Sequence, residues 1–211
     1  MCTALGFVHL RRGAAVQAVP FLERSIKMCR TYAFDNWVPW TASSLGLAYA
    51  LAGRHSEGIE LAQEAVKRGE ELRLTRFQPL RVSLLANSYL LAGQSENALV
   101  AARNALELAR RYQERGPEAW ALYLIAASMA QLQPAEGQEM RDSYLAALRL
   151  AEELGMRPLV AHCHIGLGRL HAACGDKNTA RNELQTALSM YCQMDMGFWL
   201  AKATAELEEM G

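Results

Sequence analysis

The sequence repeats the same order of small and large residues every 40 positions, and this period limits what the chain can fold into. The second copy reads Leu45-Gly46, Tyr49, Gly53 and Gly58, and the third copy repeats this order without a gap. The opening leucine or isoleucine of each copy stands at Leu5, Leu45, Leu85, Ile125 and Leu167. Five copies at a nearly fixed spacing predict a stacked array, and such arrays usually bind other molecules rather than transform them.

Each copy contains two helical segments joined by a short glycine-containing turn. In the second copy we expect one helix over 39–51 and a second over 56–72. Pro39 fits the first turn of a helix, where the backbone needs no amide hydrogen. Ser56 and, one copy later, Ser95 are expected to cap the second helix with their hydroxyl groups.

The small residues of the pattern have a mechanical role. Two helices approach closely only where the side chains between them are small. Small residues on the first helix of a copy should therefore face small residues on the second helix. They are Gly46, Ala86, Ala126 and Gly168 on the first helices, and Gly58, Ala98 and Ala180 on the second helices. Because no pair can bury its apolar face alone, neighbouring pairs must stack.

Composition and charge exclude several classes of protein. Hydrophobic residues make up 51% of the chain and charged residues 21%, which excludes general disorder. The 22 basic and 22 acidic residues balance, so the basic footprint of a nucleic-acid-binding protein is missing. No apolar run approaches the roughly 20 residues that span a bilayer, and the first residues lack a secretory signal. We therefore expect a cytoplasmic protein with neither nucleic-acid nor membrane partners.

The five cysteines form an odd number without the spacing of a disulfide framework. They are Cys2, Cys29, Cys163, Cys174 and Cys192. Since all lie within expected helices, we predict reduced and mostly buried thiols.

The order of small and large residues resembles the tetratricopeptide repeat. The slots of that repeat match Leu45-Gly46, Tyr49, Gly53, Gly58 and Ala65, and the third and fifth copies match as well. The resemblance implies an all-α fold: a right-handed superhelical solenoid of five antiparallel helix pairs with a C-terminal capping helix. The expected repeats are 1–36, 37–76, 77–116, 117–157 and 158–196, and the expected capping helix is 197–211, all in one domain.

The period here exceeds the usual tetratricopeptide period of about 34 residues. The longer form is similar to the arrays of large bacterial signalling ATPases, nucleotide cyclases and transcription activators. The block 156–200 is especially similar to the closing repeat of bacterial cyclase-ATPase-repeat proteins. This resemblance implies a protein–protein interaction scaffold, the C-terminal sensor or scaffold region of a bacterial signalling protein. The alternative is a free-standing adaptor that binds a peptide or an amphipathic helix in its concave groove.

Two segments depart from the regular copies. In the fourth copy, residues 131–135 replace the glycine turn and Met140 occupies a small-residue slot, so we expect an altered turn and a local change of pitch. In the expected capping helix, Trp199, Leu200 and Ala203 should cover the fifth pair. The acidic residues of that helix, Glu206, Glu208 and Glu209, should face water.

No catalytic or cofactor site follows from the residues. The most suggestive cluster is His162, Cys163, His164, His171 and Cys174. His164 and His171 are seven residues apart, about 10 Å along a helix, so one ion cannot join them, and we interpret both as core residues. The segment 166–168 lacks the preceding strand and the Lys-Ser/Thr ending of a phosphate loop. We expect no enzyme activity, no cofactor and no metal.

A basic run on the second helix of the third copy has two possible roles. It consists of Arg103, Arg110, Arg111 and Arg115. The favoured interpretation is a solvated helix end that complements the helix dipole. The alternative is a patch for an acidic partner.

The resemblance places partner binding on the first helices, which form the concave wall in this family. The matching residues are Trp40, Ser43, Leu47, Leu80, Ser83, Asn87, Trp120, Tyr123 and Arg169, with Thr3, Phe7, Leu10, Ala50, Leu90, Ala127, Ala130, His162, Ile165 and Ala172 beside them. Only Asn87 and Arg169 could contribute to the carboxylate clamp of chaperone-binding members, so that clamp is absent. The wall suits a protein or peptide partner, or another part of the same polypeptide.

The beginning of the array lacks a capping segment, since Met1 leads almost directly into the first helix. An uncapped repeat leaves an apolar end exposed. We therefore expect self-association through Leu5, Phe7 and Val8, or a preceding repeat.

Overall fold

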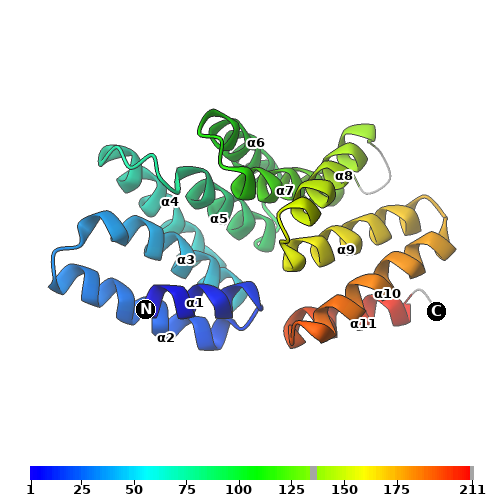
Figure 1. Cartoon of the computed structure of the whole chain (residues 1–211), viewed down its shortest axis with the longest axis horizontal. Helices are drawn as coiled ribbons and strands as arrows, with labels where there is room; N and C mark the ends of the chain where they lie inside the picture. Colours follow the sequence, from blue (N-terminus) through cyan, green and yellow to red (C-terminus); the bar gives the residue numbers. More distant parts are fainter. Residues whose placement is uncertain (134–136, 210–211) are drawn as a thin grey trace.

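The computed structural model describes residues 1–133 and 137–209, and this part of the chain contains only helices and their connections (Figure 1). The helices are α1 (Cys2–Arg11), α2 (Ala15–Thr31), the short 3-10 helix η1 (Asp35–Trp37), α3 (Val38–Leu51), α4 (His55–Glu71), α5 (Gln78–Leu91), α6 (Ser95–Arg111), α7 (Arg115–Leu132), α8 (Gln138–Glu153), α9 (Arg157–Ala173), α10 (Lys177–Gln193) and α11 (Gly197–Glu209). None of these helices combines the length and hydropathy that crossing a membrane requires.

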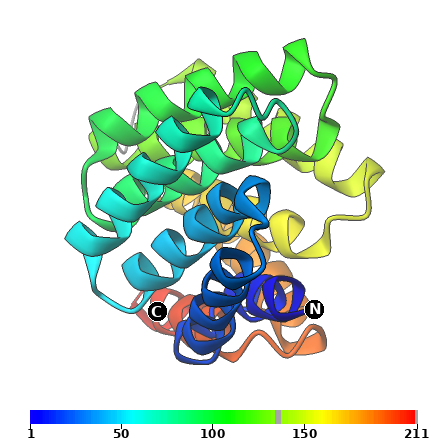
Figure 2. The same cartoon turned by 90° about the vertical axis from the view of Figure 1, so that its left-hand side faces the viewer.

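Consecutive helices pack in antiparallel pairs, from α1 with α2 to α9 with α10, and α11 packs on α10. The pairs follow one another along an arch that begins with the blue helices in Figure 1, passes through the green ones and returns with the orange ones. Figure 2 shows both chain ends in the lower part of the molecule. The predicted all-α fold of helix pairs with a terminal helix is confirmed.

The paired helices touch backbone to backbone at the small residues. A Cβ atom on Gly46 would lie 2.6 Å from the carbonyl oxygen of Gly58, and one on Gly58 would lie 2.5 Å from the carbonyl oxygen of Gly46. In the next pair the same slots hold Ala86 and Ala98, both fully buried. The predicted contact of small residues therefore exists, and it is tightest between α3 and α4.

The turns inside the pairs are made by glycines in the left-handed region, such as Gly53 with φ +85° and Gly93 with φ +74°. After these turns the second helices begin earlier than expected, α4 at His55 and α6 at Ser95. The prediction that Ser56 and Ser95 are N-caps is therefore wrong. The N-cap residue of α4 is Arg54, whose side chain makes no capping bond. Ser95 is the first residue of α6 itself.

The fourth pair replaces small contacts by large ones. Met140 and Tyr144 of α8 are buried together in one cluster. A Cβ atom on Gly166 of α9 would collide with the Tyr144 ring, so this glycine makes room for the tyrosine. α7 begins at Arg115, two residues before the expected start of the fourth repeat. The altered turn was expected at 131–135: α7 continues to Leu132 and has Gln133 as its C-cap, and 134 and 135 lie outside the described residues.

The capping helix α11 covers the fifth pair. Ala203 and Met196 are buried, and Trp199 and Leu200 are half-buried against α10. The expectation that Glu206 faces water is wrong, because its carboxylate pairs with Arg169 of α9. Glu208 is exposed as expected, and the side chain of Glu209 lies outside the described part.

The cysteines are free thiols, but fewer of them are buried than expected. Cys29 and Cys163 are buried, whereas Cys174 and Cys192 are exposed and Cys2 is half-buried. The two exposed thiols lie at the C-terminal ends of α9 and α10.

The contact between α3 and α4 predicts a large effect of one added methyl group. Gly46→Ala should lower the free energy of unfolding by about 2 kcal/mol, because overpacking costs roughly 1–3 kcal/mol and exceeds the roughly 1 kcal/mol that alanine adds to helix propensity. Gly168→Ala is the matched control, since its Cβ would have more room, with the Cγ of Leu184 at 3.1 Å and the carbonyl oxygen of Ala180 at 3.2 Å. Urea unfolding followed by circular dichroism measures both, and equal effects would contradict the assignment of this contact.

Candidate binding site on the concave face

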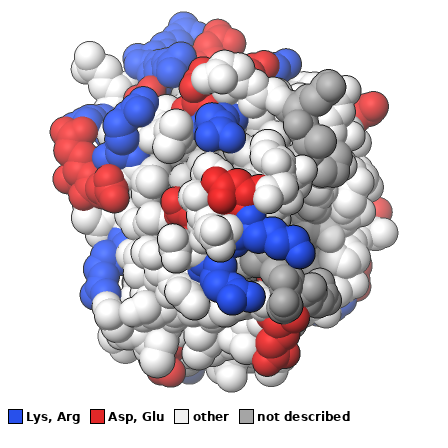
Figure 3. All heavy atoms as spheres, turned by 90° about the vertical axis from the view of Figure 1, so that its right-hand side faces the viewer, with Lys and Arg blue, Asp and Glu red and all other residues white. Residues whose placement is uncertain are grey.

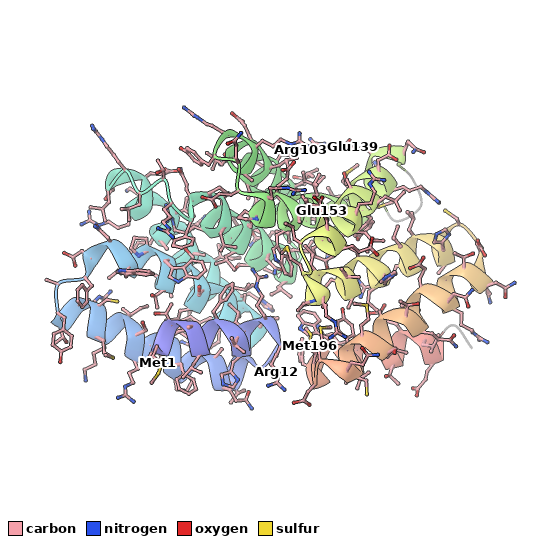
Figure 4. All side chains as sticks on the ribbon, viewed as in Figure 1. Met1, Arg12, Arg103, Glu139, Glu153 and Met196 are labelled. Carbon is pink, nitrogen blue, oxygen red and sulfur yellow. The ribbon has the colours of Figure 1, made fainter. Side chains whose placement is uncertain are left out.

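The two ends of the arch touch each other. Arg12 donates hydrogen bonds to the backbone oxygen of Asp195, at 3.2 Å from Nε and 2.8 Å from Nη2, and pairs with its carboxylate. A Cβ atom on Gly13 would lie 2.8 Å from Nε1 of Trp199. Figure 4 shows Arg12 close to Met196 where the arms of the arch meet. We name this contact between the α1–α2 turn and the start of α11 the seam.

Arg11 lies beside the seam and reaches across the inside of the arch. Its guanidinium lies 4.0 Å from the ring centroid of Trp120 and 4.7 Å from that of Phe7. Within the described ranges no carboxylate pairs with it and no hydrogen bond satisfies it. Burial lowers the pKa of Arg11 to about 9, which still leaves the guanidinium charged at neutral pH.

His162 occupies the centre of the concave wall. Its ring packs edge-on against Trp199 with centroids 4.7 Å apart, and a hydrogen bond of 2.7 Å joins its Nδ1 to the hydroxyl of Tyr191. Burial, followed by the charges of Arg11 and Arg169, lowers the pKa of His162 to about 3. The imidazole is therefore neutral, and it serves as a hydrogen-bond partner and a packing surface rather than as a cation.

These central side chains divide the concave interior into two hollows. The apolar hollow, about 300 Å³, is lined by Phe7, Arg11, Leu80, Gly116, Pro117, Trp120, Met156, Pro158 and Leu159. The polar hollow, about 280 Å³, is lined by Asn87, Leu90, Leu91, Tyr123, Gln131, His162, Ile165, Arg169, Tyr191, Trp199, Lys202, Ala203 and Glu206. Only about 30 Å³ remains open between them, because Arg11, Trp120, His162 and Trp199 fill the middle.

The cations of the polar hollow are largely matched by an internal carboxylate. Arg169 donates from Nε to Glu206 at 2.8 Å and makes a second, shorter bond to the same carboxylate. The hydrogen bond to Glu206 raises the pKa of Arg169, so this charge is permanent. Burial raises the pKa of Tyr123 to about 12, so its hydroxyl stays protonated. Lys202 is the further cation on this wall.

The structure distributes the expected groove residues over three environments. Leu80 and Trp120 line the apolar hollow, and Asn87, Tyr123 and Arg169 line the polar hollow. Trp40 lies between two other aromatic rings, with centroid distances of 5.1 Å to Phe7 and 5.2 Å to Phe77.

Three of the expected groove residues are not accessible. Ser43, Leu47 and Ser83 are buried, and the two serine hydroxyls donate to the carbonyl oxygens of Pro39 and Pro79, each at 2.9 Å. Leu47 borders only the small gap between the two hollows. Contact of these three residues with a partner stays a prediction.

Sequence reasoning missed several residues of this interior. Arg11 follows Phe7 by four positions on α1 and so shares its face, a signal that was available. Trp199 and Lys202 belong to the capping helix, and their arrival at the concave wall depends on the curvature of the whole arch. No local pattern encodes that curvature.

The histidines and cysteines of α9 do not converge. His164 lies 2.6 Å from a Glu183 carboxylate oxygen, and His171 lies 3.8 Å from that of Asp176. No three His, Cys, Asp or Glu side chains gather as a metal site within residues 1–133 and 137–209. Each histidine instead has its own neighbouring partner.

The basic run of the third copy is mostly paired. Arg103 contacts Glu139 at 3.0 Å, as Figure 4 shows, and Arg110 contacts Glu118 at 2.9 Å. Arg115 belongs to α7 rather than to α6 and binds Glu153. Both signs of charge also alternate over the face shown in Figure 3. The run therefore joins neighbouring pairs, which weakens its interpretation as an acidic-partner patch.

The neutral His162 predicts a specific pH dependence. Its pKa is about 3 in the folded chain and about 6.5 when exposed, so the unfolded chain binds the extra proton between these values and stability falls as pH falls. From pH 6.5 to pH 5 the loss should be about 2 kcal/mol, at roughly 1.4 kcal/mol per pH unit. His162→Gln, which keeps an acceptor for Tyr191, should remove this part of the loss.

Urea unfolding at the two pH values measures it, with the exposed His55→Gln as control. A His162→Gln variant that keeps the full wild-type dependence would show that His162 is not buried neutral.

The seam predicts a change of shape from a single methyl group. Gly13→Ala should part the ends of the arch, because its Cβ would collide with α11. Gly53→Ala is the matched control, since Gly53 also has a positive φ but has no atom within 4 Å of the added Cβ. Small-angle X-ray scattering should show a larger radius of gyration for Gly13→Ala alone. The same radius for both variants would argue against a seam in solution.

Comparison with known proteins agrees with this architecture. No protein-family model matches the chain, and no curated protein sequence matches it. Among solved structures the chain is similar to a Podospora anserina putative kinesin light chain with nearly identical TPR-like repeats. The TM-score is 0.60 at 16% identity, over 92% of this chain and 94% of that one. The chain thus has the fold of a tetratricopeptide-like repeat solenoid, with its first turn and its capping helix in contact.

Proposed function

We propose that the chain is a protein–protein interaction scaffold without catalytic activity, and that the outer face of α1 is one of its contact surfaces. The supporting observation is a difference in burial between equivalent positions. Leu5 is 41% exposed, whereas its equivalents Leu45 and Leu85 are 4% and 9% exposed. Val8 is 55% exposed, whereas Ala48, at the same position of the second copy, is fully buried.

The buried equivalents are covered by the second helix of the preceding pair. Leu45 and Ala48 of α3 belong to one cluster with Leu22 and Ile26 of α2. No described helix covers α1 in this way. A helix laid on α1 as α2 lies on α3 would bury Leu5 and Val8, at roughly 1.5–3 kcal/mol for each fully buried side chain. The array therefore offers an amphipathic helix a preformed site at this end.

At the opposite end of the array, α11 packs on the fifth pair. Phe7, which was expected to share the apolar end, packs instead against Trp40 and Arg11 inside the arch. The proposed contact surface is therefore Leu5 and Val8, with Phe7 removed from it.

A second copy of the chain is the occupant that can be tested directly. We expect the wild-type chain to dimerise and Val8→Lys to be monomeric, because a charge in the contact must be desolvated. Val100→Lys is the matched control, since Val100 is 72% exposed on α6. Light scattering after size exclusion measures the mass. A wild-type monomer, or a Val8→Lys dimer, would contradict the proposed surface.

The alternative function is a free-standing adaptor that binds a peptide or amphipathic helix in the concave groove. It requires the arch to open. The seam would oppose opening only weakly, because its ion pair is exposed and such pairs contribute only about 0–1 kcal/mol to stability. Trp40→Ala with Trp120→Ala should then abolish capture of a protein partner. Capture that survives both substitutions would count against the groove.

We further propose that this scaffold is the C-terminal region of a bacterial signalling protein of the cyclase or ATPase type. Its support is the resemblance of 156–200 to the closing repeat of such proteins, and α9, α10 and α11 form the closing unit of this arch. The test is the reading frame that surrounds the coding sequence. A cyclase or ATPase domain in frame would support the proposal, and a frame limited to repeats would contradict it.

A further inference from the structure

We infer that the apolar hollow binds a small amphipathic carboxylate, a ligand with an unbranched apolar body and one anionic head. This site is separate from the outer face of α1 and does not depend on the proposed scaffold function. It rests on one juxtaposition, a guanidinium without a carboxylate partner at the wall of an otherwise apolar hollow.

The lining of the hollow is nearly all hydrocarbon and aromatic ring. The lining comes from Phe7 of α1, Leu80 of α5, Trp120 of α7, and Pro158 and Leu159 of α9. The volume of about 300 Å³ is at the lower end of the range for small-molecule sites. This is the volume that about ten water molecules occupy in the liquid. A chain of about ten carbon atoms therefore matches its size.

Arg11 supplies the charge that an anionic head requires. Its guanidinium faces the rings of Trp120 and Phe7, which offset part of the desolvation of the cation. The neighbouring Arg12 has a carboxylate partner in Asp195, whereas Arg11 has none within the described residues. The amino ends of α7 and α9, which are the positive ends of their dipoles, also border the hollow at Pro117 and Pro158.

The scarcity of other polar groups excludes several ligand classes. Apart from Arg11 and the indole of Trp120, no lining side chain carries an N–H or O–H group. A peptide would bury amide groups without partners, and a sugar or nucleotide would bury hydroxyls, each at an appreciable cost. A ligand with one anionic head and an apolar body would pair with Arg11 and contact the apolar lining.

Gly116 leaves one wall of the hollow open. A Cβ atom there would have only the Sδ atom of Met156 nearby, at 4.0 Å. The first carbon of a larger side chain at this position would therefore be accommodated without collision. Gly116→Leu should therefore fill the hollow and leave the charge of Arg11 unchanged.

The experiment is calorimetric titration of the full chain with decanoate. Decan-1-ol tests the need for the charge, and the tripeptide Ala-Leu-Phe tests a peptide carboxylate. The variants are Arg11→Met, which keeps an apolar stem without the charge, Gly116→Leu, and Arg24→Met as the matched control, since Arg24 is exposed on α2 and does not line the hollow. Circular dichroism verifies that each variant is folded, and Gly116→Leu carries the test if Arg11→Met is not.

We expect decanoate to bind the wild-type chain and Arg24→Met equally. Its affinity should fall at least about tenfold in Arg11→Met and in Gly116→Leu, and decan-1-ol should bind the wild-type chain at least about tenfold more weakly. Three results would overturn the inference: no binding at about 1 mM decanoate, equal binding to all variants, or tighter binding of the tripeptide than of decanoate.

Discussion

The close contact between paired helices is the constraint on which the rest of the structure depends. At Gly46 and Gly58 the backbones of α3 and α4 touch, and in the next repeat the fully buried Ala86 and Ala98 occupy the same slots. The distance between paired helices sets how each pair sits on the next one, and small rotations accumulate along an array. Here they accumulate until the first turn reaches the capping helix. The interior is therefore shaped by contacts that lie far from it.

Closure of the arch changes the electrostatics of its inner wall. An open groove would leave Arg11 and His162 in water, whereas the closed arch places both among aromatic rings. Burial then lowers the pKa of both groups, with opposite consequences, because His162 becomes neutral while Arg11 keeps its charge. On the same wall Arg169 is neutralised by Glu206. The two hollows consequently differ in chemistry, although α5, α7 and α9 contribute to the lining of both.

The sequence predicts the parts of this fold that depend on local spacing. The period specifies the helix pairs, the small contacts and the capping helix, because each follows from residues within one or two turns of one another. The openness of the groove could not be predicted, since it depends on the summed pitch of five pairs. Ser43 and Ser83 illustrate this limit: their positions on the first helices were identified, but not their burial. Arg11 was missed because its environment is formed by α7, more than one hundred residues away.

The first helix combines three roles on three faces. Leu5 and Val8 lie on the outer face, whereas their equivalents Leu45, Leu85 and Ala48 are buried by a neighbouring helix pair. Arg11 points inward to Trp120, and Arg12, the next residue, reaches the capping helix across the seam. A ligand bound beside Arg11 only in the closed arch would stabilise closure by mass action. A helix bound to the outer face would act on the same α1 from its other side. The position of α1 therefore links the outer contact surface, the apolar hollow and the seam through a single rigid element.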